Sequence, residues 1–207
     1  MIPFSLREKS FPIFLELLCV QGAIAIINVF YSLFVTVLDL VICAFLLRVI
    51  LQLVRANFYN PISQLIWKVT QPVTVPLTRF LPRWRNVDIA AVLVLGLIAI
   101  LDIVIVGGLY ARSLDAGQTV WFALLKIVSL GLRLYTLCLL VVTILSWVGP
   151  GTSNPAANVL WSITEPVLRP VRRILPPIGG LDLSPIPVMI VFQALDTWMQ
   201  SLLGLFH

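Results

Sequence analysis

Four long apolar stretches constrain this sequence most strongly, near residues 31–54, 88–110, 120–147 and 184–206. The hydrocarbon core of a bilayer is about 30 Å thick, and an α-helix of about 20 residues crosses it. Backbone polar groups inside lipid must bond within the chain, so each stretch is expected to be helical. The sequence therefore predicts an all-α membrane protein with four transmembrane helices.

The composition supports a membrane protein over a soluble one. Of 207 residues, 60% are hydrophobic and 11% are charged, and the mean hydropathy is +1.05. A soluble domain is about half apolar and about a quarter charged. The net charge is +5, but the cations flank the apolar stretches. That position fits anionic lipid headgroups and membrane orientation, and it argues against nucleic acid as a partner.

The chain contains an internal repeat with an offset of 94 residues (154 − 60). Without any insertion, identical residues coincide in pairs: Asn60-Pro61 with Asn154-Pro155, Trp67 with Trp161, Pro72 with Pro166, Pro76 with Pro170, Asp88 with Asp182, and Asp102 with Asp196. So many matches of varied residue type indicate duplication. Each copy reads span, basic loop, span, so both copies are expected to insert the same way up, related by a pseudo-twofold axis along the membrane normal.

This repeat divides the chain into a first repeat at 30–110, a linker with the start of the third span at 111–124, and a second repeat at 125–207. Residues 1–29 form an apolar N-terminal extension. Arg7 and Lys9 precede its apolar run, as in a signal peptide, whereas Glu16 inside the run argues against one. A signal, an interfacial helix, an extra span and an upstream extension from a mis-set start codon all remain open.

Each loop begins with Asn-Pro, which is typical of a helix start with asparagine as the cap. An apolar stripe follows: Ile62, Leu65, Ile66 and Val69 in the first copy; Val159, Leu160 and Ile163 in the second. The later prolines (Pro72, Pro76 and Pro82; Pro166, Pro170 and Pro176) are expected to break each loop into short pieces. Such short amphipathic helices are predicted to lie in the membrane interface. A short helix packed on the bundle is the alternative.

Cations concentrate in the two loops, which carry Arg55, Lys68, Arg79, Arg83 and Arg85 in the first copy and Arg169, Arg172 and Arg173 in the second. The connection between the copies has only Arg112, offset by Asp115. The positive-inside rule then predicts a multi-pass membrane protein with both loops cytoplasmic and the C-terminus outside. These cations are expected to contact anionic lipid headgroups, with Trp67 and Trp161 as anchors at the headgroup level. The alternative is that the arginines only set the orientation of the chain in the membrane.

The loops resemble the YggT family of bacterial membrane proteins. The resemblance rests on Arg-Ala-Asn-Phe-Tyr-Asn-Pro-Ile-Ser-Gln at 55–64, Thr-Gln-Pro at 70–72, and the run from Glu165 to Pro185, and it covers about residues 30–206. It implies links to osmotic tolerance, envelope organisation and division, and, through chloroplast and cyanobacterial relatives, to haem attachment to a cytochrome b. It implies no catalytic residue.

Ionisable residues inside spans are costly and call for explanation. Asp39, Asp102, Arg133 and Asp196 are predicted to lie at one depth, one on each span, as an intramembrane polar layer of net charge −2. One interpretation is a buried cluster that holds the copies together, and the other is a cation or proton site. Arg48, nearer the loop end, is expected to snorkel towards the surface.

Several absences argue against an enzyme. The only histidine is His207, at the end of the chain, so Ser-His and Cys-His pairs are not available. Cys19, Cys43 and Cys138 lack metal or redox spacing, and no cofactor or metal site is predicted. Asp88 and Asp182, which directly precede spans, are interpreted as helix caps.

Three functions follow from these features. The first is a non-enzymatic scaffold or envelope-maintenance factor that offers its basic loops to lipids and membrane-protein partners. The second is a small homo-oligomeric channel or transporter for ions or osmolytes that uses the acidic layer. The third and weakest is cofactor delivery to a membrane cytochrome, with the haem ligand supplied by the client.

Overall fold

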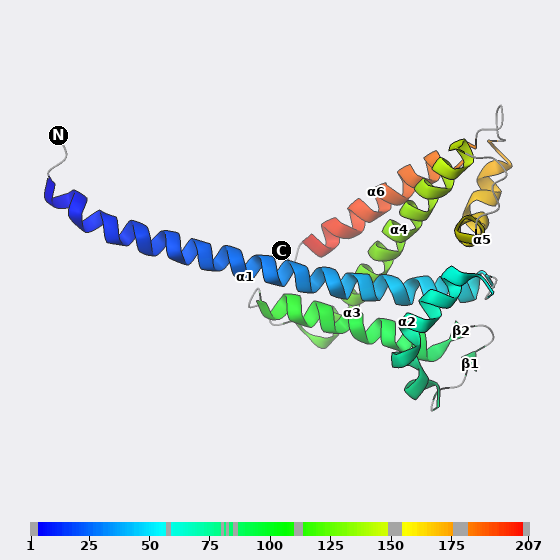
Figure 1. Cartoon of the computed structure of the whole chain (residues 1–207), viewed down its shortest axis with the longest axis horizontal. Coiled ribbons are helices and arrows are strands. Elements are labelled where there is room, and N and C mark those ends of the chain that lie inside the picture. The colour runs from blue at the N-terminus through cyan, green and yellow to red at the C-terminus, as the bar shows by residue number, and fades with distance from the viewer. Residues whose placement is uncertain are drawn as a thin grey trace. The chain divides into compact units, whose positions relative to one another are not determined.

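The computed structural model describes residues 4–56, 59–79, 81, 83–84, 87–109, 114–148, 155–175 and 182–204. These residues form six helices and a hairpin of two short strands, each two residues long: α1 (Phe4–Leu53), α2 (Pro61–Thr78), β1 (Arg83–Trp84), β2 (Val87–Asp88), α3 (Ile89–Leu109), α4 (Ala116–Val148), α5 (Pro155–Arg172) and α6 (Pro185–Gly204) (Figure 1). The chain divides into two units, Met1–Asp39 and Leu40–His207.

Four helical segments are long and apolar enough to cross a membrane, Ala25–Leu53, Ile89–Gly108, Ala116–Ser146 and Pro185–Gly204. They lie within α1, α3, α4 and α6 and confirm the four spans expected from the sequence. The segments between the spans of each repeat form α2 and α5. The protein is therefore an α-helical multi-pass membrane protein.

The N-terminal extension is helical and continuous with the first span. Helix α1 runs from Phe4 to Leu53, 50 residues, without interruption. No turn separates residues 4–29 from the span, but whether this segment is a signal, an interfacial helix or an extra span stays a prediction.

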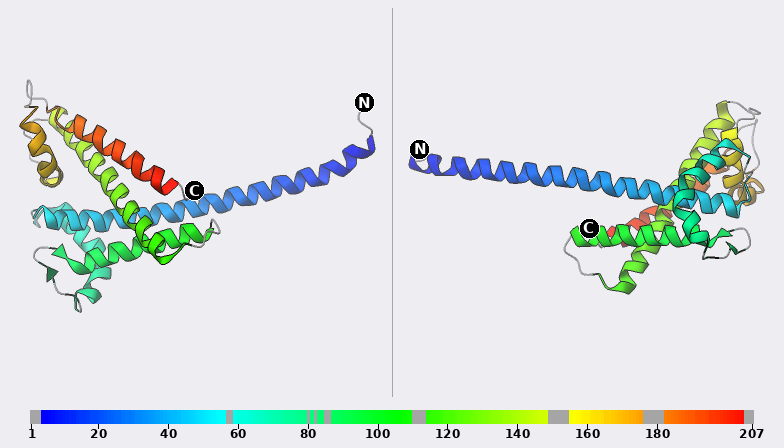
Figure 2. Two further views of the ribbon diagram at one scale, coloured as in Figure 1. Left: turned by 180° about the vertical axis from the view of Figure 1, so that it is seen from behind. Right: turned by 60° about the horizontal axis from the view of Figure 1, so that its bottom comes forward.

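Helix α4 is the centre of the second unit, because α3, α5 and α6 all pack against it. Both views of Figure 2 show α6 running alongside α4, in agreement with Figure 1. The largest buried cluster joins the C-terminal part of α1 to α3 and α4 through residues such as Phe45, Val94, Ala99 and Phe122. The two repeats are thus packed against each other along the spans.

Helices α2 and α5 lie at one end of this unit and contact each other (Figure 1). The side chain of Asn60 caps α2 by accepting a hydrogen bond from the Ile62 N–H at 3.0 Å. The same side chain donates from Nδ2 to the carbonyl of Pro155, the first residue of α5. Equivalent ends of the two loop helices therefore meet, as two parallel repeats require. Asn154 itself lies outside the described residues.

The prediction that prolines break the loops is wrong for four of them. Helix α2 continues through Pro72 and Pro76, and α5 continues through Pro166 and Pro170. The prolines of each pair are four residues apart, so they fall on one side of the helix, and that side is exposed. The carbonyls that lose their helical partners also lie on this exposed side, where solvent or headgroups can bond them.

The loop helices turn equivalent positions towards the bundle but differ in how fully they are covered. Buried positions coincide in the repeat: Ser63 with Ala157, Thr70 with Thr164, and Thr74 with Leu168. The apolar stripe differs, because Val159 and Ile163 are buried in α5 while Leu65 and Val69 are exposed in α2. The stripe of α5 therefore packs on the bundle, whereas much of the stripe of α2 is free to meet lipid.

This asymmetry predicts unequal effects of one substitution at equivalent positions. Ile163 is 1% exposed and Val69 is 62% exposed. Ile163→Ala is expected to lower the free energy of unfolding by about 2–5 kcal/mol, because a cavity remains in the core. Val69→Ala should change it by less than about 0.5 kcal/mol. Thermal or dodecyl-sulfate unfolding of the purified protein, followed by circular dichroism, measures both; equal losses would contradict the described packing.

Candidate functional site: paired charges and a basic face

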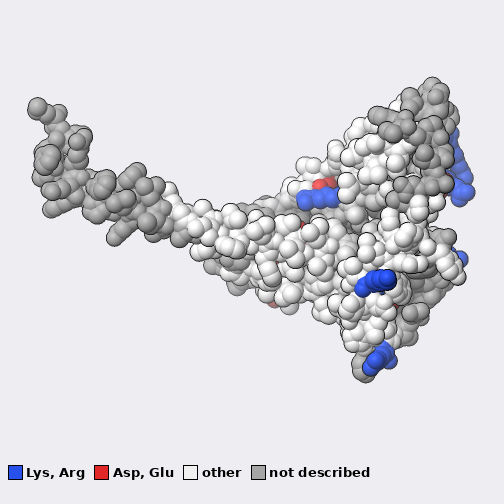
Figure 3. Space-filling view, viewed as in Figure 1, with Lys and Arg blue, Asp and Glu red and all other residues white. Residues whose placement is uncertain are grey.

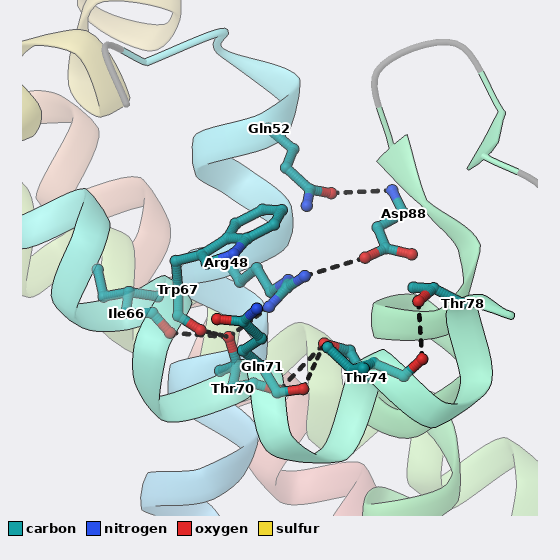
Figure 4. Close-up of polar contacts among 10 residues, drawn as sticks. Arg48, Gln52, Ile66, Trp67, Thr70, Gln71, Thr74, Thr78 and Asp88 are labelled. Carbon is teal, nitrogen blue, oxygen red and sulfur yellow. Dashed lines mark hydrogen bonds and ion pairs between the residues drawn. The ribbon is translucent and has the colours of Figure 1, made fainter. Parts of the chain in front are cut away.

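A buried ion pair ties the first span to the entrance of the second. Arg48 on α1 donates from Nη2 to Oδ2 of Asp88 at 3.0 Å, and both side chains are almost fully buried (Figure 4). Asp88 directly precedes α3. Two charges removed from water need each other and further hydrogen bonds to be tolerated.

Further polar contacts surround this pair. Arg48 Nη1 donates to the Thr70 hydroxyl at 2.7 Å, and Gln52 Oε1 accepts from the Asp88 N–H at 2.9 Å. The guanidinium of Arg48 lies 4.0 Å from the ring centroid of Trp67, a cation–π contact. In Figure 4, α1, α2 and the start of α3 converge on this arginine. Arg48 therefore links α1 to α2 and to the start of α3. The expectation that it snorkels to the surface is wrong, because its side chain is buried.

The second repeat binds its equivalent aspartate with an arginine from another helix. Val142 replaces Arg48 at the repeat position (142 − 48 = 94), and Arg172 on α5 replaces Thr78 (172 − 78 = 94). Arg172 contacts Asp182 at 2.8 Å and also Glu165 at 2.6 Å. Val142 packs in one cluster with Trp161, as Arg48 packs on Trp67. Both repeats therefore pair the aspartate before their second span with an arginine, but the arginine comes from a different position in each repeat.

These contacts refine the roles predicted for the aspartates. Asp182 Oδ1 accepts from the N–H and the hydroxyl of Ser184, which directly precedes α6, so Asp182 orders the turn before the helix, and its role as a helix cap stays a prediction. Asp88 occupies the corresponding position, but its described side-chain contact is Arg48. Partial burial alone would raise the pKa of Asp182. The hydrogen bonds from Ser184 and the charge of Arg172 outweigh burial and hold that pKa below the usual 3.8.

Asp102, in the middle of α3, is fully buried and pairs with Lys126 on α4. Lys126 was absent from the sequence-based count of charges within the spans. A charge scan of residues 120–147 would have found it, although its repeat position holds Ser32, which carries no charge (126 − 32 = 94). This pair joins the second span of the first repeat to the first span of the second repeat.

Asp196, in α6, is held by a different part of α4. It accepts from Arg133 Nε at 3.0 Å, from the Ser129 hydroxyl, and from Gln200 Nε2 at 2.6 Å. Asp196 is mostly buried, while the side chain of Arg133 is 51% exposed. Lys126 and Arg133 are seven residues apart, about 10 Å along α4.

Two separate ion pairs are described at positions of the predicted polar layer. The structure brings Asp196 and Arg133 together but places Asp102 with Lys126. Each aspartate has its own cation, so the charge of these four residues sums to zero when all are ionised. Asp39 is the last residue of the first unit, and its part in any layer stays a prediction. The pairing favours the interpretation that buried charges hold helices together.

Several loop cations are exposed and make no ion pair with any acid in the described part of the chain: Arg55, Lys68, Arg79, Arg169 and Arg173. Figure 3 shows blue side chains over α2 and α5. Arg172 does not belong to this basic face, because Glu165 and Asp182 neutralise it. The side chains of Arg83 and Arg85 lie outside the described residues. Trp67 and Trp161 are half-buried and contribute to packing.

Arg55 has an unusual backbone. Its φ is +52°, in the left-handed region that favours glycine. It ends α1 in a Schellman motif, in which the N–H of Ala56 bonds to the carbonyl of Leu51 at 3.0 Å and the N–H of Arg55 to that of Gln52 at 3.2 Å. The repeat-equivalent residue is Gly149 (149 − 55 = 94). The first repeat thus keeps a cation at the position where glycine would be less strained.

Among the described residues, no group of three or more histidine, cysteine or acidic side chains has a geometry that holds a metal ion. Cys43 and Cys138 both lie within spans, and Cys138 is buried. What the described part offers is charge: buried pairs between helices, and a basic face at the end where α2 and α5 meet.

The exchanged arginine gives a testable prediction. Arg48→Val leaves Asp88 buried without its cation and should lower the free energy of unfolding by about 3–5 kcal/mol. Adding Thr78→Arg gives the first repeat the arrangement of the second, since positions 78 and 88 are spaced like 172 and 182. The double variant should regain at least half of the free energy of unfolding that Arg48→Val loses, as measured by dodecyl-sulfate unfolding. A double variant no more stable than Arg48→Val would show that the two arrangements are not equivalent.

Comparison with known proteins adds independent evidence. The sequence model of the CCB3/YggT family matches residues 27–109 and again 121–203. These two matches are offset by 94 residues (121 − 27), the same offset as the internal repeat. No solved structure matches the chain.

Three relatives illustrate the similarity. A Vibrio alginolyticus protein, described as lying in the proC 3′ region, is 40% identical over 174 residues, 82% of this chain and 92% of that protein. An uncharacterized protein of Pseudomonas aeruginosa is 40% identical over 159 residues, 73% of this chain and 78% of its own length. YggT of Escherichia coli K12 is 34% identical over 170 residues, 81% and 87% of the two chains. The family resemblance seen in the loops is thereby confirmed, and the chain belongs to the CCB3/YggT family, with two copies of the family unit in tandem.

Proposed function

We propose that this chain is a non-enzymatic scaffold of the bacterial inner membrane that holds a basic face against anionic lipid headgroups. The observation that carries the proposal is the group of exposed cations at α2, α5 and the end of α1 that make no ion pair with the acids of the described ranges. Such cations attract anionic lipid by about 1 kcal/mol each near a membrane surface. A support role in osmotic tolerance or envelope maintenance is consistent with a protein that works by binding and positioning.

The backbone at Arg55 supports a selected role for this charge. A residue other than glycine in the left-handed region costs about 1–2 kcal/mol. The second repeat has glycine, Gly149, at the equivalent position of its sequence, so an arginine is not common to both repeats. A strained backbone that is retained suggests that the side chain does something useful. Headgroup binding is a sufficient reason.

The paired charges within the spans argue for this role over ion handling. A cation site needs acidic groups with negative charge to spare, whereas Asp102 and Asp196 are each neutralised by a base of α4. These pairs make rigid contacts between spans, and rigid spans suit a scaffold that presents two loop helices in a constant arrangement.

Lipid retention tests the proposal. Native mass spectrometry of the detergent-solubilised protein can count phosphatidylglycerol molecules retained against phosphatidylcholine. Replacing Lys68, Arg79, Arg169 and Arg173 by glutamine should reduce the preference for the anionic lipid, with roughly a fivefold loss of affinity for each cation. Arg112→Gln, in the connection between repeats, is the control and should leave the preference unchanged. Equal retention by the fourfold variant and the native chain would refute headgroup binding.

Arg55→Gly separates binding from folding. This variant removes one charge and relieves the backbone strain, so anionic lipid retention should fall while stability stays the same or rises by up to about 1 kcal/mol. If lipid retention falls while stability does not, partial unfolding of the variant is excluded as the cause of the weaker binding. A variant that is stabilised and retains as much phosphatidylglycerol as the native chain would contradict a role for Arg55 in binding.

The orientation is tested by labelling with a membrane-impermeant maleimide. In a background without native cysteines, Lys68→Cys and Arg173→Cys should be labelled only after spheroplasts are broken, because both loops are proposed to face the cytoplasm. Gln118→Cys, at the opposite end of α4, should be labelled in intact spheroplasts. Labelling of positions 68 and 173 from different sides would overturn the parallel arrangement of the repeats.

A further inference from the structure

The Arg133–Asp196 pair lies in the middle of the membrane spans and yet is open on one side. Arg133 stands 17 residues from the start of the span Ala116–Ser146 and 13 from its end (133 − 116; 146 − 133). Its side chain is 51% exposed. In Figure 3 a blue and a red patch lie together over α4 and α6, surrounded by uncharged atoms. About half of the Arg133 side chain is therefore exposed to whatever surrounds the spans.

Lipid is a poor neighbour for this group. Charged side chains at mid-membrane depth face other protein or a water-filled space, because hydrocarbon cannot solvate them. Arg133 has a long side chain, but both ends of its span are more than a dozen residues away, and its Nε is held by Asp196 at 3.0 Å. The structure thus requires a polar cover for this pair.

The exposed side of α6 next to the pair is also unusually polar for a span. Gln193, Thr197, Gln200 and Ser201 are exposed and follow helical spacing of three, four and seven residues along one side. The span of α6 has the lowest hydropathy of the four, 1.3, and only 6% of it is buried. Thr197 and Ser201, four residues apart, are small enough to let another helix approach closely.

We propose that this face, formed by Arg133 of α4 with Gln193, Asp196, Thr197, Gln200 and Ser201 of α6, is the interface with a second copy of the same chain. The polar groups on it are self-complementary. The pair contains both signs of charge, and the glutamine amides and hydroxyls each donate and accept hydrogen bonds. Under a twofold axis along the membrane normal, the patch lies at the same depth in both copies, so the arginine of one copy can face the aspartate of the other.

Disulfide cross-linking in native membranes is the first test. In a background without native cysteines, Thr197→Cys should form a covalent dimer of twice the chain mass. Val191→Cys is the matched control, since it lies on the same helix, is similarly exposed, and is rotated by about 120° from Thr197. Dimer at position 197 and little at 191 supports the proposal. The absence of a dimer at position 197, or a product that joins position 197 to another protein, would overturn it.

The second test measures association without disturbing the ion pair. Thr197→Trp should block the close approach of two α6 helices and weaken dimerisation by tenfold or more. Dimerisation is measured in nanodiscs, and by light scattering in mild detergent. Because Thr197 is exposed and its described side-chain hydrogen bond goes to the carbonyl of Gln193, the variant should keep the native helix content and the Arg133–Asp196 pair. A native chain that is monomeric in both media, or a Thr197→Trp variant that remains dimeric, would refute the interface.

Discussion

A charge inside a membrane protein must have a partner, and most of this fold can be understood from that constraint. Arg48 meets Asp88, Lys126 meets Asp102, Arg133 meets Asp196, and Arg172 meets Asp182. Each pair joins different helices or joins a loop helix to the start of a span. Apolar contacts between helices gain little in lipid, which is as apolar as the side chains, so these polar contacts specify which helices meet and in which rotation. Helix α4 is central because it carries two of the four cations.

Duplication explains the symmetry of the fold, and divergence explains its asymmetry. Positions 63, 70 and 74 of α2 and their equivalents in α5 face the bundle alike, and Asn60 of one repeat touches Pro155 of the other. Yet α5 buries its apolar stripe and α2 does not, and Arg55 stands where the second repeat has glycine. The two halves therefore share a framework but present different surfaces, which would be expected if each loop meets a different environment.

The sequence predicted the features that depend on local pattern and missed those that depend on rotation about a helix axis. Apolar length located the four spans, the offset of 94 residues revealed the repeat, and Asn60-Pro61 marked a helix start. Pairing between spans could not be read in the same way, because the partner of Asp102 is set by how α3 and α4 face each other. The prolines misled, since their cost depends on whether the released carbonyls are exposed, and that is a property of packing.

The exchanged arginines also constrain the history of the chain. If the duplicated halves began alike, one of them lost an arginine and gained another ten residues before its aspartate. Losing the first cation before gaining the second would have left a buried carboxylate alone, a step that selection would oppose. The permitted route passes through an intermediate with both arginines, in which the new cation made the old one dispensable. The geometry of the ion pairs therefore implies the order of the two substitutions, gain before loss. A related repeat unit with cations at the positions equivalent to both 48 and 78 would support this order.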